Sequence, residues 1–155
     1  MPTHQENRRL PHRPEQMFDL VAEVEKYPEF LPWCVASRIR SRSETLLVAD
    51  LVIGFKGIRE SFTSIVSLDR QNLVIQVEYQ DGPFKHLNNY WKFKPADDGS
   101  CILDFYVDFE FKSRILQKAI ELLFGEAVRR MVGAFEKRAV ALYGKTGTES
   151  GSTDW

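Results

Sequence analysis

Cysteine and histidine are scarce in this chain, and their positions exclude several classes of site. Cys34 and Cys101 are the 2 cysteines in 155 residues, and they lie far apart, outside any CxxC pair. This density is too low for a small scaffold held by disulfides, so we expect two reduced thiols and a cytoplasmic protein. His4, His12 and His86 form no HExxH motif and no zinc-ligand spacing with cysteine, so no metal centre is expected.

Long apolar runs and an excess of one charge are also missing. No stretch of about 18 apolar residues occurs, and the first ten residues are polar, so neither a membrane span nor a secretion signal is predicted. The 21 basic and 22 acidic side chains give a net charge of -1. Such a balance provides no overall field for nucleic acid or an anionic membrane, and no DNA partner is expected. A local basic patch remains possible.

Motifs for nucleotide binding and for serine hydrolysis are absent, because the chain contains no GxGxxG, Walker or GxSxG sequence. Paired carboxylates occur at Asp97 and Asp98, in a predicted turn, and at Asp104 and Asp108, on the polar face of a predicted strand. Solvated surface groups explain both pairs better than acid-base catalysis does. Glu60 is the only acid or base worth testing, so we predict no catalytic residue and no enzyme.

The strongest pattern runs from Cys101 to Tyr143. Every second residue from Cys101 to Phe111 is apolar, which predicts a long strand with one buried face. Ser113 then fits the N-cap of a helix that continues to Tyr143, about 45 Å long, with apolar residues at steps of three and four. The apolar face of this helix is wide, so we expect it to lie along a concave sheet. Such an arrangement leaves space for an apolar ligand.

The rest of the chain predicts a sequential antiparallel sheet. A polar edge strand is expected at 3–10, followed by a helix from Pro14, although Arg13 is a poor cap for it. A short turn or helix bracketed by prolines follows. Further strands are predicted at 35–42, 45–55, 57–68, 72–80 and 87–95. The prediction is one α+β domain over residues 1–144, with about seven strands curved around a long C-terminal helix and two short helices after the first strand. Residues 145–155, rich in glycine, serine and threonine, are predicted to be a disordered tail.

Some polar side chains share the predicted inner face of the sheet with apolar ones. Glu60 and Ser64 alternate with Phe62, and Asn89 alternates with Trp91. These polar groups either satisfy one another or recognise a ligand, and both interpretations stay open. Trp91 fits a core position better than a ligand platform. The predicted cavity residues are Glu60, Phe62, Ser64, Val77, Asn89, Trp91, Phe105, Val107, Leu123, Ala127 and Met131.

Several connections carry large apolar side chains beside lysine. If they gather at one end of the sheet, they form an apolar rim with basic flanks that suits a bilayer or a protein partner. The alternative is that the rings fold inward and the lysines are ordinary surface charges. The predicted rim residues are Phe30, Trp33, Phe55, Lys56, Phe84 and Lys85.

Five segments carry a family resemblance: EVEKYPEFLPWC at 23–34, FKGIRESFT at 55–63, DGPFKHL at 81–87, WKF at 91–93 and DFEF at 108–111. They resemble the coenzyme Q-binding family of the START-like, polyketide-cyclase-type superfamily, a group that also contains the bacterial ribosome-association toxin. The resemblance covers residues 3 to 143. It implies a helix-grip fold with a lipid-sized tunnel, and it implies that ubiquinone is bound and delivered to respiratory complexes without catalysis.

Two functions of different classes follow from this resemblance. In the first, the cavity binds ubiquinone or a similar isoprenoid lipid, with peripheral contact to the inner membrane or a respiratory complex and no other cofactor. In the second, the protein binds the large ribosomal subunit and blocks subunit joining. The near-neutral charge favours the first function, because surfaces that bind RNA usually carry a basic excess.

Overall fold

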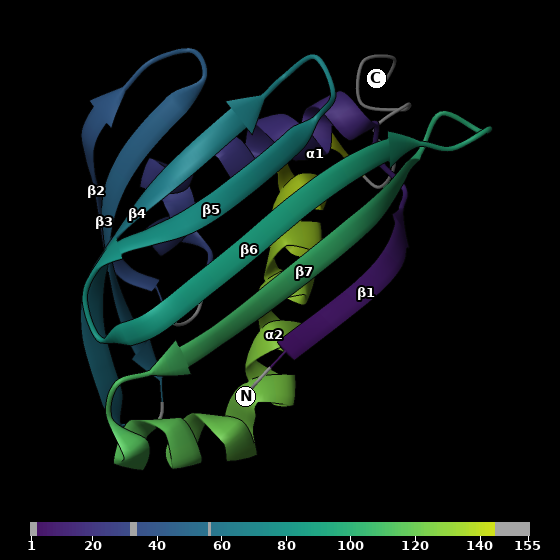
Figure 1. The fold of residues 1–155 in the computed structure, drawn as a ribbon. Helices are drawn as coiled ribbons and strands as arrows, with labels where there is room; N and C mark the ends of the chain where they lie inside the picture. The colour runs from purple at the N-terminus through teal and green to yellow at the C-terminus, as the bar shows by residue number, and fades with distance from the viewer. Residues whose placement is uncertain (1–2, 32–33, 56, 145–155) are drawn as a thin grey trace.

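Seven strands form a single antiparallel sheet in the computed structural model, which describes residues 3–31, 34–55 and 57–144. The strands are β1 (Thr3–Leu10), β2 (Cys34–Arg42), β3 (Leu46–Phe55), β4 (Ile58–Asp69), β5 (Val74–Asp81), β6 (Phe84–Pro95) and β7 (Cys101–Phe111). Their order in the sheet is β1-β7-β6-β5-β4-β3-β2, so β2 to β7 are sequential neighbours and β1 pairs with the last strand (Figure 1). The predicted α+β fold is confirmed. The predicted tail at 145–155 lies outside the described residues.

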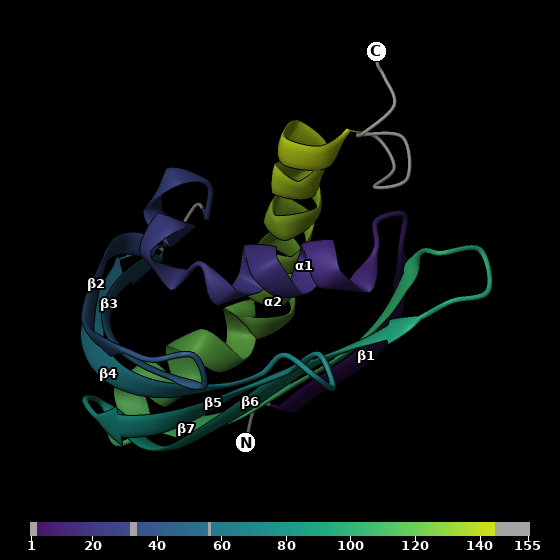
Figure 2. The ribbon, with the colours of Figure 1, turned by 90° about the horizontal axis from the view of Figure 1, so that it is seen from above.

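The helices lie on the concave side of the sheet (Figure 2). They are α1 (Pro14–Ala22), the 3-10 helix η1 (Val24–Glu29) and the long α2 (Arg114–Tyr143). Two short helices after the first strand were expected, and both are present. At the start of α1, the backbone N–H of Arg13 donates to Oε1 of Gln16 at 3.0 Å. This bond from the third helical residue replaces part of the cap that an arginine cannot supply.

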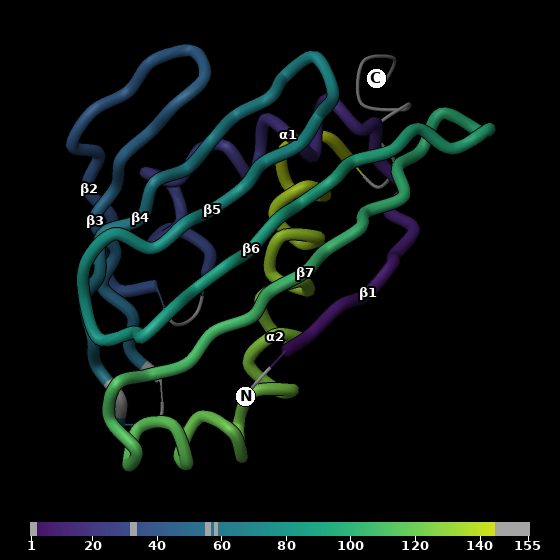
Figure 3. The backbone as a smooth tube through the Cα atoms, viewed as in Figure 1, coloured from purple at the N-terminus to yellow at the C-terminus, as the bar shows by residue number. Residues whose placement is uncertain are grey.

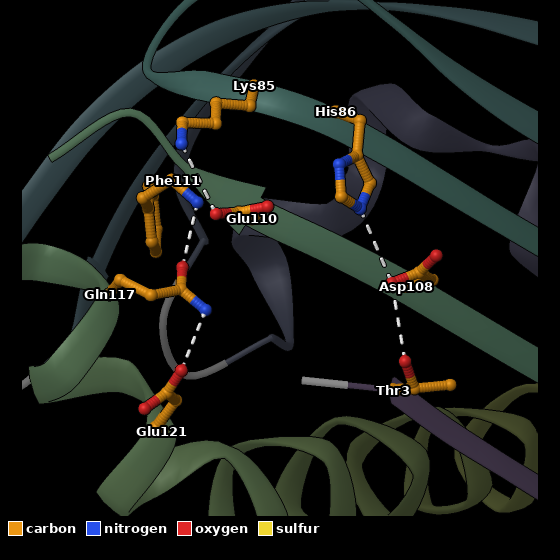
Figure 4. Close-up of polar contacts among 8 residues, drawn as sticks. All are labelled: Thr3, Lys85, His86, Asp108, Glu110, Phe111, Gln117 and Glu121. Carbon is orange, nitrogen blue, oxygen red and sulfur yellow. Dashed lines mark hydrogen bonds and ion pairs between the residues drawn. The ribbon is translucent and has the colours of Figure 1, made fainter. Parts of the chain in front are cut away.

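The junction between β7 and α2 is short and firmly bonded. Ser113 caps α2, because its Oγ accepts from the backbone N–H of Leu116 at 3.2 Å. Gln117 accepts from the N–H of Phe111 at 2.8 Å and donates to Glu121 at 3.1 Å (Figure 4). These bonds join the first turns of α2 to the end of the last strand.

Helix α2 is bent (Figures 1 and 3). Its first turns cross the end of the sheet, and the later turns run along the concave face (Figures 1 and 3). The later part carries the buried residues of the helix, Val128, Val132, Phe135 and Ala139. No helix in the described ranges is both long enough and apolar enough to cross a membrane.

The turn between β5 and β6 is tighter than expected. The sequence predicts a strand from residue 87, but β6 begins at Phe84, so only Gly82 and Pro83 separate the two strands. Gly82 has φ 143°, and a Cβ at this position would lie 2.6 Å from the Cβ of Phe62. Only glycine fits this approach. The tight turn makes Phe84 a strand residue, and its ring is 4% exposed.

Candidate functional site: an apolar cavity between sheet and helix

A cavity of about 230 Å³ lies between the concave face of the sheet and α2, and it is partly open to solvent. Strands β3 to β7 form its floor, while α2, η1 and the start of β2 form its other walls. All the described residues that line it are uncharged, and most are aliphatic or aromatic. The cavity therefore suits an uncharged ligand with a large apolar surface.

Most residues predicted to face a cavity do line this one: Phe62, Ser64, Val77, Asn89, Trp91, Phe105, Val107, Ala127 and Met131. They come from four strands and from α2, and the alternation of the strands brings them to one face.

Two of the predicted cavity residues do not line it. Glu60 is half-buried opposite Ile53, close to the start of β4, where the sheet reaches its end. Leu123 is one residue, about 100° of helical rotation, from Phe124, which does line the cavity. Leu123 therefore lies beside the face of α2 that lines the cavity. The prediction of a cavity position is wrong for both Glu60 and Leu123.

Trp91 is held at the cavity wall by its neighbours. Its ring centroid lies 4.7 Å from that of Phe105 and 5.1 Å from that of Phe135. Its Nε1–H donates to Oδ1 of Asn89 at 2.9 Å, and Nδ2 of Asn89 donates to the carbonyl oxygen of Tyr106 at 2.8 Å. The polar groups of Asn89 and Trp91 thus satisfy each other, as one of the two interpretations held, while both residues still line the cavity.

Aromatic rings at one end of the cavity were only partly foreseen. Phe109 and Phe111 line it together with Phe84 and Phe62, and the ring of Phe84 stacks on that of Phe111 with centroids 4.8 Å apart. The period of two in β7 already placed Phe109 and Phe111 on the inner face. Their distance from α2, and hence their exposure to the cavity, had no signal in the sequence.

Two ionisable groups in the wall stay neutral. Burial raises the pKa of the Tyr27 hydroxyl, which donates to the carbonyl oxygen of Val21 at 2.5 Å. Burial also raises the pKa of the Cys34 thiol to about 11. Neither group adds a negative charge to the cavity at neutral pH. Both lie beside the proline-bracketed connection, where the sequence has no periodicity that would predict which side chains point toward the cavity.

Of the residues predicted to form the rim, the structure describes the side chains of Phe30, Phe84 and Lys85. Phe84 is buried in the cavity wall, so the prediction of an outward ring is wrong for it. Phe30 is half-buried, with its ring 5.1 Å from that of Phe135. Lys85 is exposed and lies 3.4 Å from Glu110 (Figure 4). Trp33, Lys56 and the side chain of Phe55 lie outside the described part of the chain.

A different apolar surface occurs on the first turns of α2. Ile115 is 82% exposed and Leu122 is 88% exposed, and their spacing of seven residues puts them on one side of the helix. Arg114 and Lys118 are exposed beside them. Within the described ranges, no group of three or more His, Cys, Asp or Glu side chains could hold a metal ion.

Comparison with known proteins places this chain in a family. The family described as polyketide cyclase/dehydrase and lipid transport matches residues 10–136. The ribosome association toxin RatA of Rickettsia prowazekii is 39% identical over 142 residues, which are 90% of this chain and 97% of that protein. The mitochondrial coenzyme Q-binding protein COQ10 homolog B of Xenopus laevis is 39% identical over 134 residues, which are 84% of this chain and 55% of that protein. Neither name denotes an enzyme.

Solved structures agree on the architecture. The solution structure of the 18 kDa protein CC1736 from Caulobacter crescentus has a TM-score of 0.76 at 34% identity, and the match covers 93% of this chain and 99% of that one. The Zhui aromatase/cyclase from a Streptomyces species has a TM-score of 0.80 at 16% identity, covering 89% of this chain and 93% of that one, which shows the fold alone. The chain belongs to the polyketide cyclase/dehydrase and lipid transport family, and it has the START-like, helix-grip fold.

Proposed function

We propose that this protein binds an isoprenoid quinone of the ubiquinone type in its cavity and carries it without chemical change. The observation that carries the proposal is the uncharged lining, mostly aliphatic and aromatic, of a cavity of about 230 Å³. A quinone ring is flat and apolar with few polar atoms, which matches such a lining. The relative named as a coenzyme Q-binding protein supports the choice of quinone among apolar ligands.

The size of the cavity limits how much of the ligand is enclosed. Its volume of about 230 Å³ is below the range of roughly 300–1,000 Å³ that is usual for drug-sized ligands. A substituted ring with the first part of its tail fits that space, while the rest of a long tail extends through the opening. A quinone with a short tail should therefore retain most of the affinity.

Filling the cavity tests this proposal. Ala127 lines it from α2, and Ala127→Trp places an indole ring in the space. We expect at least a tenfold loss of affinity for a short-tailed quinone, measured by equilibrium dialysis. Overpacking costs about 1–3 kcal/mol, so the variant should stay folded. Ala141→Trp, at an exposed position of the same helix, is the matched control. Unchanged affinity in a folded Ala127→Trp variant would show that the quinone does not occupy this cavity.

The bound molecule can also be identified directly. We expect an isoprenoid quinone to remain with the protein when it is extracted from its native host under mild conditions. Mass spectrometry of the intact complex, and of the lipid released from it, measures this. Recovery of a different lipid class in stoichiometric amount would show that the ligand is not a quinone.

Delivery requires contact with a bilayer, because such a quinone is insoluble in water. Ile115 and Leu122, more than four-fifths exposed, supply apolar contacts at one end of the molecule. Arg114 and Lys118 on the same turns supply positive charge, which favours an anionic surface. We therefore propose that the first turns of α2 rest on the bilayer during transfer, in place of the rim that the sequence suggested.

Ribosome association is the second candidate function. It is favoured by the relative named RatA, which this chain matches over 97% of its length. On α2, Arg129, Arg130 and Lys137 are exposed, although Arg130 lies 2.8 Å from Glu126. Sedimentation of the purified protein with large ribosomal subunits tests this candidate. Because the surface and the cavity are separate, Ala127→Trp should still sediment with subunits if this function holds.

A further inference from the structure

Ser64 is the polar side chain of the cavity that its neighbours leave unbonded. It is 0% exposed and lines the cavity from the middle of β4. Its backbone pairs with Ala49 on one side and Tyr79 on the other, and Phe62 and Val66 flank it on the same face of its own strand. Among the residues that the structure describes, none forms a hydrogen bond with its Oγ.

The other polar side chains that line the cavity in the described ranges are already engaged. Asn89 is bonded to the indole of Trp91 and to a backbone carbonyl. Thr63, the neighbour of Ser64, is bonded to Asp50 at 2.6 Å. A buried hydroxyl without a partner is unfavourable, and serine on an otherwise apolar face has no packing advantage over alanine. Its presence points to a partner that enters the cavity.

We propose that the Ser64 hydroxyl donates a hydrogen bond to an oxygen atom of the bound ligand. This inference rests on the proposed function and adds the polar contact by which the cavity recognises its ligand. The cavity then selects an apolar molecule that carries a carbonyl oxygen over a hydrocarbon of the same shape. Apolar contacts supply most of the affinity, and Ser64 sets which end of the ligand is inside.

Tyr79 provides an internal comparison. Its hydroxyl oxygen is also buried without a hydrogen-bond partner within the described chain, and it lies across the β4–β5 pairing from Ser64. Its ring packs on Phe84, with centroids 5.4 Å apart, and is not part of the cavity lining. Tyr79→Phe therefore removes a similar buried hydroxyl at a neighbouring position without removing the proposed contact.

The experiment compares two probes in four proteins. The probes are a benzoquinone with a ten-carbon tail and decylbenzene, which has a ring and a tail but no oxygen. The proteins are the parent, Ser64→Ala, Tyr79→Phe and Ser61→Ala, which alters an exposed serine of β4. Ser64→Ala should bind the quinone about fivefold to tenfold more weakly and decylbenzene at least as well as the parent. Its melting temperature should be equal or higher, because a buried unbonded hydroxyl has been removed. The other two variants should bind both probes as the parent does.

Four results would overturn this inference. Equal quinone affinity in Ser64→Ala and the parent would exclude the hydrogen bond while leaving the proposed function intact. An equal loss for both probes, or the same loss in Tyr79→Phe, would show that the pairing of β4 and β5 had changed instead. Binding of neither probe by the parent would refute the proposed function as well.

Discussion

Replacing Phe84 by alanine should lower the stability of the protein strongly, because the ring is part of the core. It is 4% exposed, and four aromatic rings surround it, with centroids 4.8 to 5.8 Å away. A buried Phe→Ala change costs about 3–5 kcal/mol. Phe84 also lines the cavity, so one side of the ring has fewer contacts to lose. We therefore expect a value near the lower limit, about 3 kcal/mol, against a total stability of about 5–15 kcal/mol.

Urea unfolding followed by circular dichroism measures this effect. With a slope of about 2 kcal/mol per molar urea, the midpoint should fall by about 1.5 M with little change in slope. Leu122→Ala is the control, because this side chain is 88% exposed and its loss should cost less than about 0.5 kcal/mol. A change below about 1 kcal/mol for Phe84→Ala would refute the placement of the ring in the core.

Replacing Ile115 and Leu122 together by serine should slow quinone transfer between anionic liposomes severalfold and leave the affinity in solution unchanged, with Leu142→Ser, at the last turn of α2, as the control. Equal transfer rates for the double variant and the parent would contradict docking through this surface. Cys34 and Cys101 should resist alkylation at pH 8 in the folded protein, because burial raises their pKa values to about 11 and about 12; labelling followed by mass spectrometry should show both react only after unfolding. The folded protein also retains the Cys34 proton to a higher pH than the unfolded chain does. The stability that this proton contributes is therefore complete below pH 9 and is lost as the pH rises toward 11. Urea midpoints measured across that pH range would detect the loss.

The fold was largely predictable because the strands alternate clearly. In β7 the burial pattern follows the alternation of the sequence from Cys101 to Phe105, and the same rule placed Phe62, Val77 and Trp91 on the inner face. Alternation depends only on the geometry of an extended chain, so it needs no knowledge of distant contacts. For that reason the inner face of the sheet was the part of the site that sequence reasoning described best.

The failures depend on contacts between distant segments. Phe84 seemed to lie in a loop because the closeness of Gly82 to Phe62, which permits the tight turn, is a tertiary contact. Leu123 seemed equivalent to Ala127 because the sequence does not show which face of α2 turns toward the cavity. That orientation is set by how α2 packs on the sheet. The bend of α2 and the volume of the cavity are likewise properties of the packed molecule, and no local pattern encodes them.

The pairing of the first strand with the last affects how the chain can fold during synthesis. β1 pairs with β7, and Leu10 is opposite Cys101. At about 5–20 residues per second, the intervening segment takes on the order of 5–20 s to synthesise, and during this time β1 has no strand to join. α2, which covers the apolar face of the sheet, follows later still. The sequence of β1 is polar up to Leu10 and includes Glu6 and Arg8, and charged residues of this kind discourage an unpaired strand from associating with other chains.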